Sequence, residues 1–330
     1  MSGMSEVLAV VGRQPTDYFN PREQRMYAED TRPYENLETP ERELLIRSML
    51  NRHFPVVLSE EQPIERLSVL YGDGYLDFLM NPPGERLFHR SECNGFLQDS
   101  DEYVWLDRNT FRAAKTAADV AMIASQRALL DGNMHTYGLC RPPGHHSGMN
   151  KMGGFCYLNN TALAALMLRE MGKTVGILDF DRHAGNGTHD SVLGKDGIYF
   201  SSMHVATTYP WYCTENDFYN RSGDNVMVFP LGEDDRSSDF FGQYSHALDF
   251  LTGKNVDLIL VSLGLDSSIH DVELLEEVGT FGLTREDFYK AGEELAKTGK
   301  RTVTLQEGGY NPEFLAQNLK FFLDGIKAGS

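Results

Sequence analysis

Four short segments of the chain end in residues that can bind a metal ion or transfer a proton. Two of them are Arg141-Pro-Pro-Gly-His-His146 and Asp179-Phe-Asp-Arg-His183, and the others are Leu263-Gly-Leu-Asp266 and Gln306-Glu-Gly-Gly-Tyr310. Together they offer two carboxylates and an imidazole for one ion, a histidine pair for proton transfer, and a phenol for an oxyanion. These are the groups that a metal-assisted amide hydrolysis requires.

The metal prediction depends on three residues that each follow an apolar run. Asp181 and His183 alternate along an extended segment, so their side chains share one side of it. A mixed set of carboxylate and imidazole suits zinc, and a catalytic zinc site has three protein ligands and one open position. Asp266 is the predicted third ligand. Each residue alone reads more readily as a turn cap or a surface group, so the prediction depends on the combination.

The adjacent histidines follow a Pro-Pro-Gly turn, which fixes where the two rings point. Beside a metal, one imidazole can take a proton from the attacking water while the other stays charged or donates a proton. We expect Asp179 and Asn186 to bind the far ring nitrogens of His145 and His146, respectively. Tyr310 follows two glycines, and its hydroxyl can stabilise a tetrahedral oxyanion.

These segments need a fold that brings them together, and from residue 109 onward apolar runs alternate with helical patterns. The continuous apolar run at 174–180 is typical of a parallel strand buried on both faces. Ligand-binding groups in such sheets lie beyond the carboxyl ends of the strands. Further strands are predicted at 136–140, 197–202, 226–230, 258–262 and 302–305, and helices at 41–52, 111–130, 160–170, 238–252, 285–297 and 312–326.

Length and charge limit the classes of protein that fit. We expect one catalytic domain over residues 1–330, with residues 1–60 and the loop 82–107 as variable appendages. The 48 acidic and 30 basic residues give a net charge of −18. Such a surface repels nucleic acid and anionic membranes and attracts a cationic substrate, although solubility alone also explains it.

The chain is expected to be soluble and cytoplasmic. No apolar run approaches the roughly 18 residues of a membrane span, and the N-terminus lacks the pattern of a signal peptide. The cysteines show no C-x-x-C spacing, so free thiols are expected at Cys93, Cys140, Cys156 and Cys213.

As a set, the motifs resemble the histone deacetylase superfamily over roughly residues 60–327. The resemblance implies a three-layer α/β fold of the arginase/deacetylase type, with a mostly parallel central sheet flanked by helices. It also implies one zinc ion on Asp181, His183 and Asp266. The motifs that carry it are 141–146, Gly154-Phe-Cys-Tyr-Leu-Asn-Asn160, 179–188, 264–266 and 307–310.

The same resemblance implies the roles of the remaining polar residues. His146 would be the general base, His145 its charged partner or the acid, and Tyr310 the oxyanion donor. A potassium ion would lie near Asp179 and the Ser202 hydroxyl, held partly by backbone carbonyls of Asp181, His183 and Met203.

Within the superfamily the chain is most similar to bacterial acetylpolyamine amidohydrolases. The shared traits are its size, its N-terminal segment, the 261–266 motif and the Tyr209-Pro210 position. Glu273, seven residues after Asp266, matches the gatekeeper glutamate of the eukaryotic polyamine-specific member, or is a solvated residue of an acidic loop. Phe155 and Tyr209 are either core aromatics or the walls of a narrow substrate tunnel.

Three departures from the family pattern stand out. Ala184 replaces the second histidine of most members, and Pro210-Trp-Tyr-Cys-Thr214 replaces the usual Pro-Gly-x-Gly. The loop 82–107 is shorter than in typical amidohydrolases of this group, and an acid in it, Asp101 or Glu102, is a candidate to orient substrate. The oligomeric state is left open, a homodimer among the alternatives.

The main hypothesis is a zinc-dependent amidohydrolase that deacetylates N-acetylated amines, foremost acetylpolyamines, to acetate and free polyamine. The alternative substrate is acetyl-lysine in a protein of the histone type. A third reading is an arginase-like two-manganese ureohydrolase or a non-catalytic binder. Ser267 and Ser268 directly after Asp266 disfavour a second metal, and no member of the catalytic set is missing.

Overall fold

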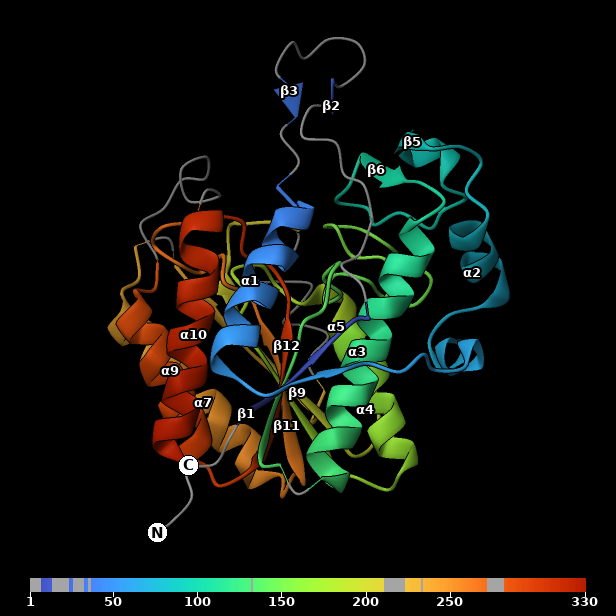
Figure 1. The fold of residues 1–330 in the computed structure, drawn as a ribbon. Coiled ribbons are helices and arrows are strands. Elements are labelled where there is room, and N and C mark those ends of the chain that lie inside the picture. The colour runs from blue at the N-terminus through green and yellow to red at the C-terminus, as the bar shows by residue number, and fades with distance from the viewer. Residues whose placement is uncertain are drawn as a thin grey trace.

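A computed structural model describes residues 7–13, 24–25, 33–34, 37–131, 133–210, 223–232, 234–271 and 282–330 (Figure 1). Its centre is a parallel sheet of eight strands. The strands are β1 (Val7–Val11), β4 (Val56–Leu58), β7 (His135–Gly138), β8 (Val175–Asp179), β9 (Ile198–Val205), β10 (Val226–Leu231), β11 (Leu258–Leu263) and β12 (Arg301–Gln306). Their order across the sheet is β10-β9-β8-β11-β12-β7-β1-β4.

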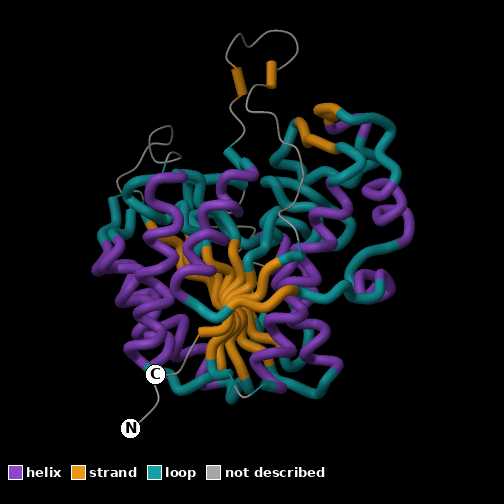
Figure 2. The backbone as a smooth tube through the Cα atoms, viewed as in Figure 1, coloured by secondary structure: helices purple, strands orange, loops and turns teal. Residues whose placement is uncertain are grey.

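Helices cover both faces of the sheet, so the predicted three-layer α/β fold is confirmed (Figure 2). One face packs against α3 (Thr110–Leu130) and α4 (Asn160–Glu170), with α2 (Asp73–Met80) and α5 (Asn186–Val192) beside them. The other face packs against α1 (Pro40–His53), α7 (Ser237–Gly253), α9 (Arg285–Lys297) and α10 (Pro312–Gly329).

The side chains of the central strands alternate between two separate apolar cores. In β11, Leu258 and Leu260 belong to the core under α3 and α4, whereas Ile259 and Val261 belong to the core under α7 and α10. Both faces are therefore buried, which explains why these strands are continuous apolar runs in the sequence. Burial of apolar surface in these two cores stabilises the sheet by roughly 25 cal/mol per Å². The cores therefore fix the positions of the strand ends.

The predicted helix at 160–170 is observed with the same bounds, and its start has a clear cause. The Asn159 side chain accepts a hydrogen bond of 2.8 Å from the backbone N–H of Ala162, which caps the first turn. The helix predicted at 41–52 is α1, and its Ile46 and Leu50 share a core with Leu319 of α10.

Two strands of the main sheet, β1 and β4, are not predicted from the sequence. They form one edge of the sheet, where β1 pairs with β7 and with β4. The segment 82–107, predicted as a long loop, contains the antiparallel pair β5 (Arg86–His89) and β6 (Tyr103–Leu106). Smaller elements are β2 (Gln24–Arg25), β3 (Pro33–Tyr34) and the 3₁₀ helices η1 (Ile64–Val69) and η2 (Arg90–Glu92).

Among the helices that the structure describes, none combines the length and the hydropathy needed to cross a membrane. Cys93, Cys140 and Cys156 are buried free thiols, as expected. Cys213 lies outside the described residues.

Candidate metal and catalytic site

The four sequence segments follow four neighbouring strands. β8, β11, β12 and β7 are adjacent in the sheet, and the segments leave them at their carboxyl ends. Residues that are more than 100 positions apart in the chain are thus brought to one edge of the sheet, as parallel sheets generally do.

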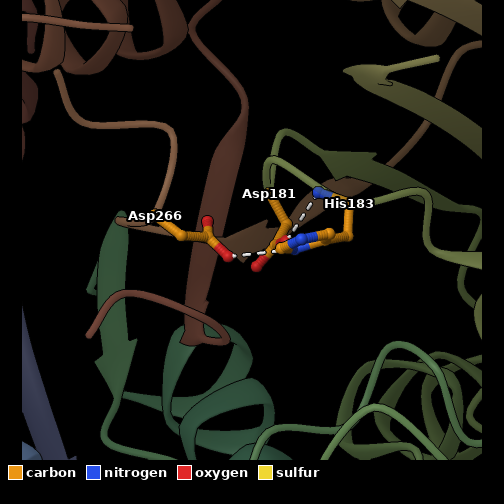
Figure 3. A group of neighbouring side chains, drawn as sticks. All are labelled: Asp181, His183 and Asp266. Atoms are coloured by element: carbon orange, nitrogen blue, oxygen red, sulfur yellow. Dashed lines mark hydrogen bonds and ion pairs between the residues drawn. The ribbon is translucent and has the colours of Figure 1, made fainter. Parts of the chain in front are cut away.

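Asp181, His183 and Asp266 form one compact group (Figure 3). Each offers a ligand atom, and these atoms all lie within 4.8 Å of one another. The His183 Nδ1 atom is 3.2 Å from Asp181 Oδ1 and 3.3 Å from Asp266 Oδ2. The three side chains could therefore hold a single metal ion.

The electrostatics of this group fit a bound cation. Burial, together with the charge of Asp181, raises the pKa of Asp266 to about 6. Burial also acts to raise the pKa of Asp181, but the charges and hydrogen bonds of His145 and His183 lower it below its usual range. The Asp266 Oδ2 atom is buried, and its contact with His183 Nδ1 at 3.3 Å does not have the geometry of a hydrogen bond. A divalent ion would satisfy that atom and neutralise the paired carboxylates.

Two glycines let the backbone approach the carboxylates closely. A Cβ atom at Gly264 would lie 2.2 Å from Asp181 Oδ2, and one at Gly308 would lie 2.2 Å from Asp266 Oδ2. The Gly308 N–H donates a hydrogen bond of 2.9 Å to Asp181 Oδ2. A side chain at either position would displace the carboxylates, so these glycines shape the group.

The two adjacent histidines have different partners, and both partners are those expected from the sequence. The His145 Nδ1 atom lies 3.1 Å from Asp179 Oδ2, a carboxylate. The His146 Nδ1 atom lies 2.7 Å from Asn186 Oδ1, a neutral amide oxygen at the start of α5. An Nδ1–H that donates to this oxygen leaves the Nε2 atom of His146 free to accept a proton.

Neighbouring charges also shift the pKa values of the two histidines in opposite directions. Burial acts to lower the pKa of His145, but the Asp181 and Asp179 carboxylates raise it to about 10. Burial lowers the pKa of His146 well below its usual value, and the charges of His145 and His183 add to this effect. These surroundings favour the charged ring at His145 and the neutral ring at His146, and the two ring centroids are 4.0 Å apart.

Tyr310 is buried on the loop that follows β12. Its backbone N–H donates a hydrogen bond of 2.7 Å to the buried Asp271 carboxylate, which also accepts 3.1 Å from the N–H of Asn311. The Tyr310 ring lies 5.8 Å from the Phe155 ring, centroid to centroid. Gly308, two residues before Tyr310, donates its backbone N–H to Asp181. The backbone of this loop therefore connects Tyr310 to the group formed by Asp181, His183 and Asp266.

The second predicted aromatic, Tyr209, lies against the histidines. Its ring centroid is 4.7 Å from that of His146 and 6.3 Å from that of His183. Its hydroxyl donates a hydrogen bond of 2.5 Å to Asp101, which also accepts from the N–H of Gly154 at 3.3 Å. Asp101, one of the two acids suggested in the 82–107 segment, is therefore next to the site.

The other acid, Glu102, is exposed, and its carboxylate is 3.9 Å from His89 Nε2. Ser202 is the register partner of Asp179 between β9 and β8, and its hydroxyl is 3.1 Å from His204 Nδ1. Met203 follows Ser202 in β9 and is buried, and Ala184 is also buried. Glu273 and the departure at 211–214 lie outside the described residues.

Arg42 is a site residue that the sequence does not reveal. It is buried in α1, and its Nη2 donates 2.7 Å to the carbonyl of Glu307. Its Nε donates 2.5 Å to the carbonyl of Gly309, and its guanidinium carbon is 4.7 Å from the Tyr310 ring centroid. No spacing pattern points to it, because it acts on carbonyls about 265 residues away. Asp271 is missed for the same reason, since its partners are backbone N–H groups.

Comparison with known proteins agrees with this geometry. The family model for the histone deacetylase domain matches residues 36–326. The chain is 33% identical to acetylpolyamine amidohydrolase 1 of Pseudomonas aeruginosa over 296 residues, which is 81% of this chain and 84% of that protein. It is 31% identical to the acetylpolyamine amidohydrolase of Mycoplana ramosa over 302 residues, 82% of this chain and 86% of the relative.

A solved structure supports the same assignment. The crystal structure of acetylpolyamine aminohydrolase from Burkholderia pseudomallei superposes with a TM-score of 0.83 and 26% identity, covering 98% of this chain and 99% of that one. The family model alone spans most of the chain, and the relatives match nearly as much of it. The protein belongs to the histone deacetylase family, and its amidohydrolase relatives include several acetylpolyamine amidohydrolases.

Proposed function

We propose that this protein is a zinc-dependent deacetylase of N-acetylated amines, with acetylpolyamines as substrates and acetate and free polyamine as products. The observation that carries this proposal is the buried group of Asp181, His183 and Asp266. It lies beside two histidines, one next to a carboxylate and the other next to a neutral amide oxygen. An acid–base pair next to a metal group suits the hydrolysis of an unactivated amide.

The three ligands suit zinc because they mix carboxylate oxygens with an imidazole nitrogen and leave room for a further ligand. When bound, zinc would supply Lewis acidity toward water and toward the substrate carbonyl. A binuclear site of the arginase type would need a second set of ligands. In the described part of the chain, one group of the required kind is found.

The chain's own residues supply the proton transfers. His146, held by Asn186, would take a proton from the attacking water at its Nε2 atom. Tyr310 would donate a hydrogen bond to the oxyanion that forms from the carbonyl. His145 would remain charged beside Asp179, and the histidine pair would return a proton to the leaving amine.

The polyamine assignment is supported by the relatives and by charge. The two relatives described above, which match more than 80% of this chain, are named acetylpolyamine amidohydrolases. The net charge of −18 favours a cationic substrate. Phe155 and Tyr209 would form the walls of the substrate tunnel. The gatekeeper role of Glu273 stays a prediction.

The second candidate is an acetyl-lysine deacetylase of the histone type. Plant histone deacetylase 8 of Arabidopsis thaliana is 27% identical over 268 residues, 73% of this chain and 68% of that protein. Both readings share the same metal group and histidine pair, so the substrate decides between them.

We further propose that residues 1–330 act as a single catalytic domain. We also propose that a potassium ion binds near Asp179. The neighbouring position of Ser202 in β9, opposite Asp179 in β8, supports the ion site. The carbonyls of Asp181, His183 and Met203 would complete it.

The test compares three substrates with the zinc-loaded protein: N-acetylputrescine, N-acetylspermidine and an acetyl-lysine peptide. We expect kcat/KM for an acetylpolyamine to exceed that for the peptide by about tenfold or more, a difference of about 1.4 kcal/mol. Equal or better turnover of the peptide would overturn the polyamine assignment. Absence of hydrolysis of all three would overturn the proposed function.

A further inference from the structure

The loop that carries His145 and His146 is held by hydrogen bonds from several parts of the fold. The backbone N–H of Thr188 donates 3.0 Å to the carbonyl of His145. The Gln98 Nε2 atom donates 2.9 Å to the carbonyl of His146. These neutral donors satisfy the carbonyls of the loop, as buried backbone groups require.

The N–H groups of the same loop face a carboxylate. The Glu307 Oε2 atom accepts hydrogen bonds from the backbone N–H of Gly144 at 2.6 Å and from that of His145 at 3.1 Å. Glu307 is fully buried. Burial raises the pKa of Glu307 to about 7, although the charge of His145 and the hydrogen bond from Gly144 act to lower it. Protonated or ionised, the side chain keeps an oxygen that accepts from both N–H groups.

The other contacts of Glu307 tie it to the rigid sheet. Its N–H donates 2.9 Å to the carbonyl of Leu263, the last residue of β11. Its Oε1 atom lies 3.4 Å from the hydroxyls of Thr161 and Ser262. The next residue, Gly308, donates to the Asp181 carboxylate. Glu307 therefore connects the histidine loop, the sheet and the metal group.

We propose that Glu307 is a positioning residue for the histidine pair. Its carboxylate fixes the distance of His145 and His146 from the group formed by Asp181, His183 and Asp266. This inference rests on the proposed function, because it concerns the placing of the acid–base pair for that reaction. Glu307 itself contacts the backbone of the loop and not the reacting atoms. A misplacement of about 1 Å in a catalytic group can cost roughly 100-fold in rate.

The first test is hydrogen–deuterium exchange, which needs no enzymatic activity. In Glu307→Ala we expect the amides of Gly144 and His145 to exchange at least about tenfold faster than in the wild type, because their acceptor is gone. The matched control is Asp119→Ala, since Asp119 is also a buried carboxylate but binds Lys115 in α3. Exchange of residues 144–145 is expected to be unchanged in that control.

The second test separates kcat from KM on the acetylpolyamine substrate. In Glu307→Ala we expect kcat to fall roughly 100-fold while KM stays within about threefold, because Glu307 does not contact substrate. Glu307→Gln keeps an oxygen that can accept both N–H groups. It should therefore recover at least about tenfold of the lost kcat.

The two tests distinguish the failure of this inference from the failure of the proposed function. If the wild type hydrolyses no acetylated amine, the proposed function fails, while the exchange data still report whether Glu307 holds the loop. Wild-type kcat and wild-type exchange in a folded Glu307→Ala would overturn the inference. If that variant does not fold, Glu307→Asp decides, because a carboxylate withdrawn by one methylene cannot keep both hydrogen bonds to Gly144 and His145, and residues 144–145 should exchange several-fold faster. Wild-type exchange and wild-type kcat in Glu307→Asp would overturn the inference.

Discussion

Buried histidines lie at both ends of the central sheet, and their surroundings differ. His135 begins β7 at the amino end, where its Nδ1 is 2.8 Å from Thr302 Oγ1 and its Nε2 is 2.7 Å from Ser330 Oγ. Burial lowers the pKa of His135 to about 4. At the carboxyl end, carboxylates raise the pKa of the equally buried His145 to about 10. Burial alone therefore gives a neutral, structural histidine, whereas adjacent carboxylates keep a buried histidine charged.

The two ends of the sheet also differ in whether their buried polar atoms have hydrogen-bond partners. Both ring nitrogens of His135 have hydroxyl partners. At the carboxyl end, Asp266 Oδ2 is buried beside a second carboxylate, and its 3.3 Å contact with His183 Nδ1 does not have the geometry of a hydrogen bond. Such an arrangement is costly unless a cation binds there. The amino end stabilises the fold, while the carboxyl end is arranged for a ligand.

The largest expected effect comes from replacing a histidine at each end in turn. In His146→Ala we expect kcat to fall by about 10²- to 10⁴-fold, because the proposed general base is removed. In His135→Ala we expect kcat within about twofold of the wild type and a loss of about 1–3 kcal/mol in the free energy of unfolding. Steady-state kinetics and urea unfolding of both variants check this. Comparable loss of kcat in the two variants would contradict the distinction between the ends.

The next effect concerns the phenol of Tyr310. Tyr310→Phe should lower kcat by about 10²- to 10³-fold, because the proposed oxyanion donor is lost, and should leave zinc stoichiometry unchanged. The matched control is Tyr244→Phe, whose buried hydroxyl donates 2.8 Å to the carbonyl of Ala291. That variant should lose about 1 kcal/mol of stability and keep its kcat. Full activity in Tyr310→Phe would remove the phenol from the mechanism.

A smaller effect is expected from a single methyl group beside the carboxylates. Gly308→Ala would place a Cβ 2.2 Å from Asp266 Oδ2 and 2.7 Å from Asp181 Oδ2. We expect zinc affinity to fall by about 10- to 100-fold, comparable to the loss of a supporting contact at a metal site. Competition with a chelator measures this. Gly242→Ala in α7 is the control, since the added carbon meets no atom within 4 Å beyond the adjoining backbone of its own helix. Unchanged affinity in both variants would exclude the steric argument.

The last effect concerns stability and not catalysis, and it is the pH dependence contributed by His135. Its pKa of about 4 in the folded protein is below the value of about 6.5 in an unfolded chain. Folding therefore favours the neutral ring, and its contribution is fully present above pH 6.5 and is lost as pH falls toward 4. Between pH 6.5 and pH 4, the free energy of unfolding should fall less in His135→Gln than in the wild type, by on the order of 2–3 kcal/mol. Parallel curves of unfolding free energy against pH for both proteins would contradict the structural role.

The fold could be predicted from the sequence where its signals are strong. The strands β8 and β11 are buried on both faces, so they appear as continuous apolar runs, and α4 has an asparagine cap. β4 is missed because it has only three residues, none of them fully buried. Its place in the sheet follows from pairing with β1, which no local pattern records.

The candidate site also contains some residues that the sequence predicts and others that it does not. Asp181, His183 and Asp266 could be predicted because each follows an apolar strand and has metal-binding chemistry of its own. Arg42 and Asp271 could not, because they act on backbone groups that only the folded chain brings near. Glu307 stands inside a recognised motif, yet its contact with the histidine loop spans more than 160 residues of sequence.

The most direct test is a zinc titration of metal-depleted protein, with hydrolysis of N-acetylputrescine as the readout. We expect activity to rise linearly and to level off at one zinc per chain, and we expect Asp266→Asn to show neither tight binding nor turnover. Full activity in the metal-depleted protein, or wild-type titration by Asp266→Asn, would contradict a single zinc ion held by Asp181, His183 and Asp266.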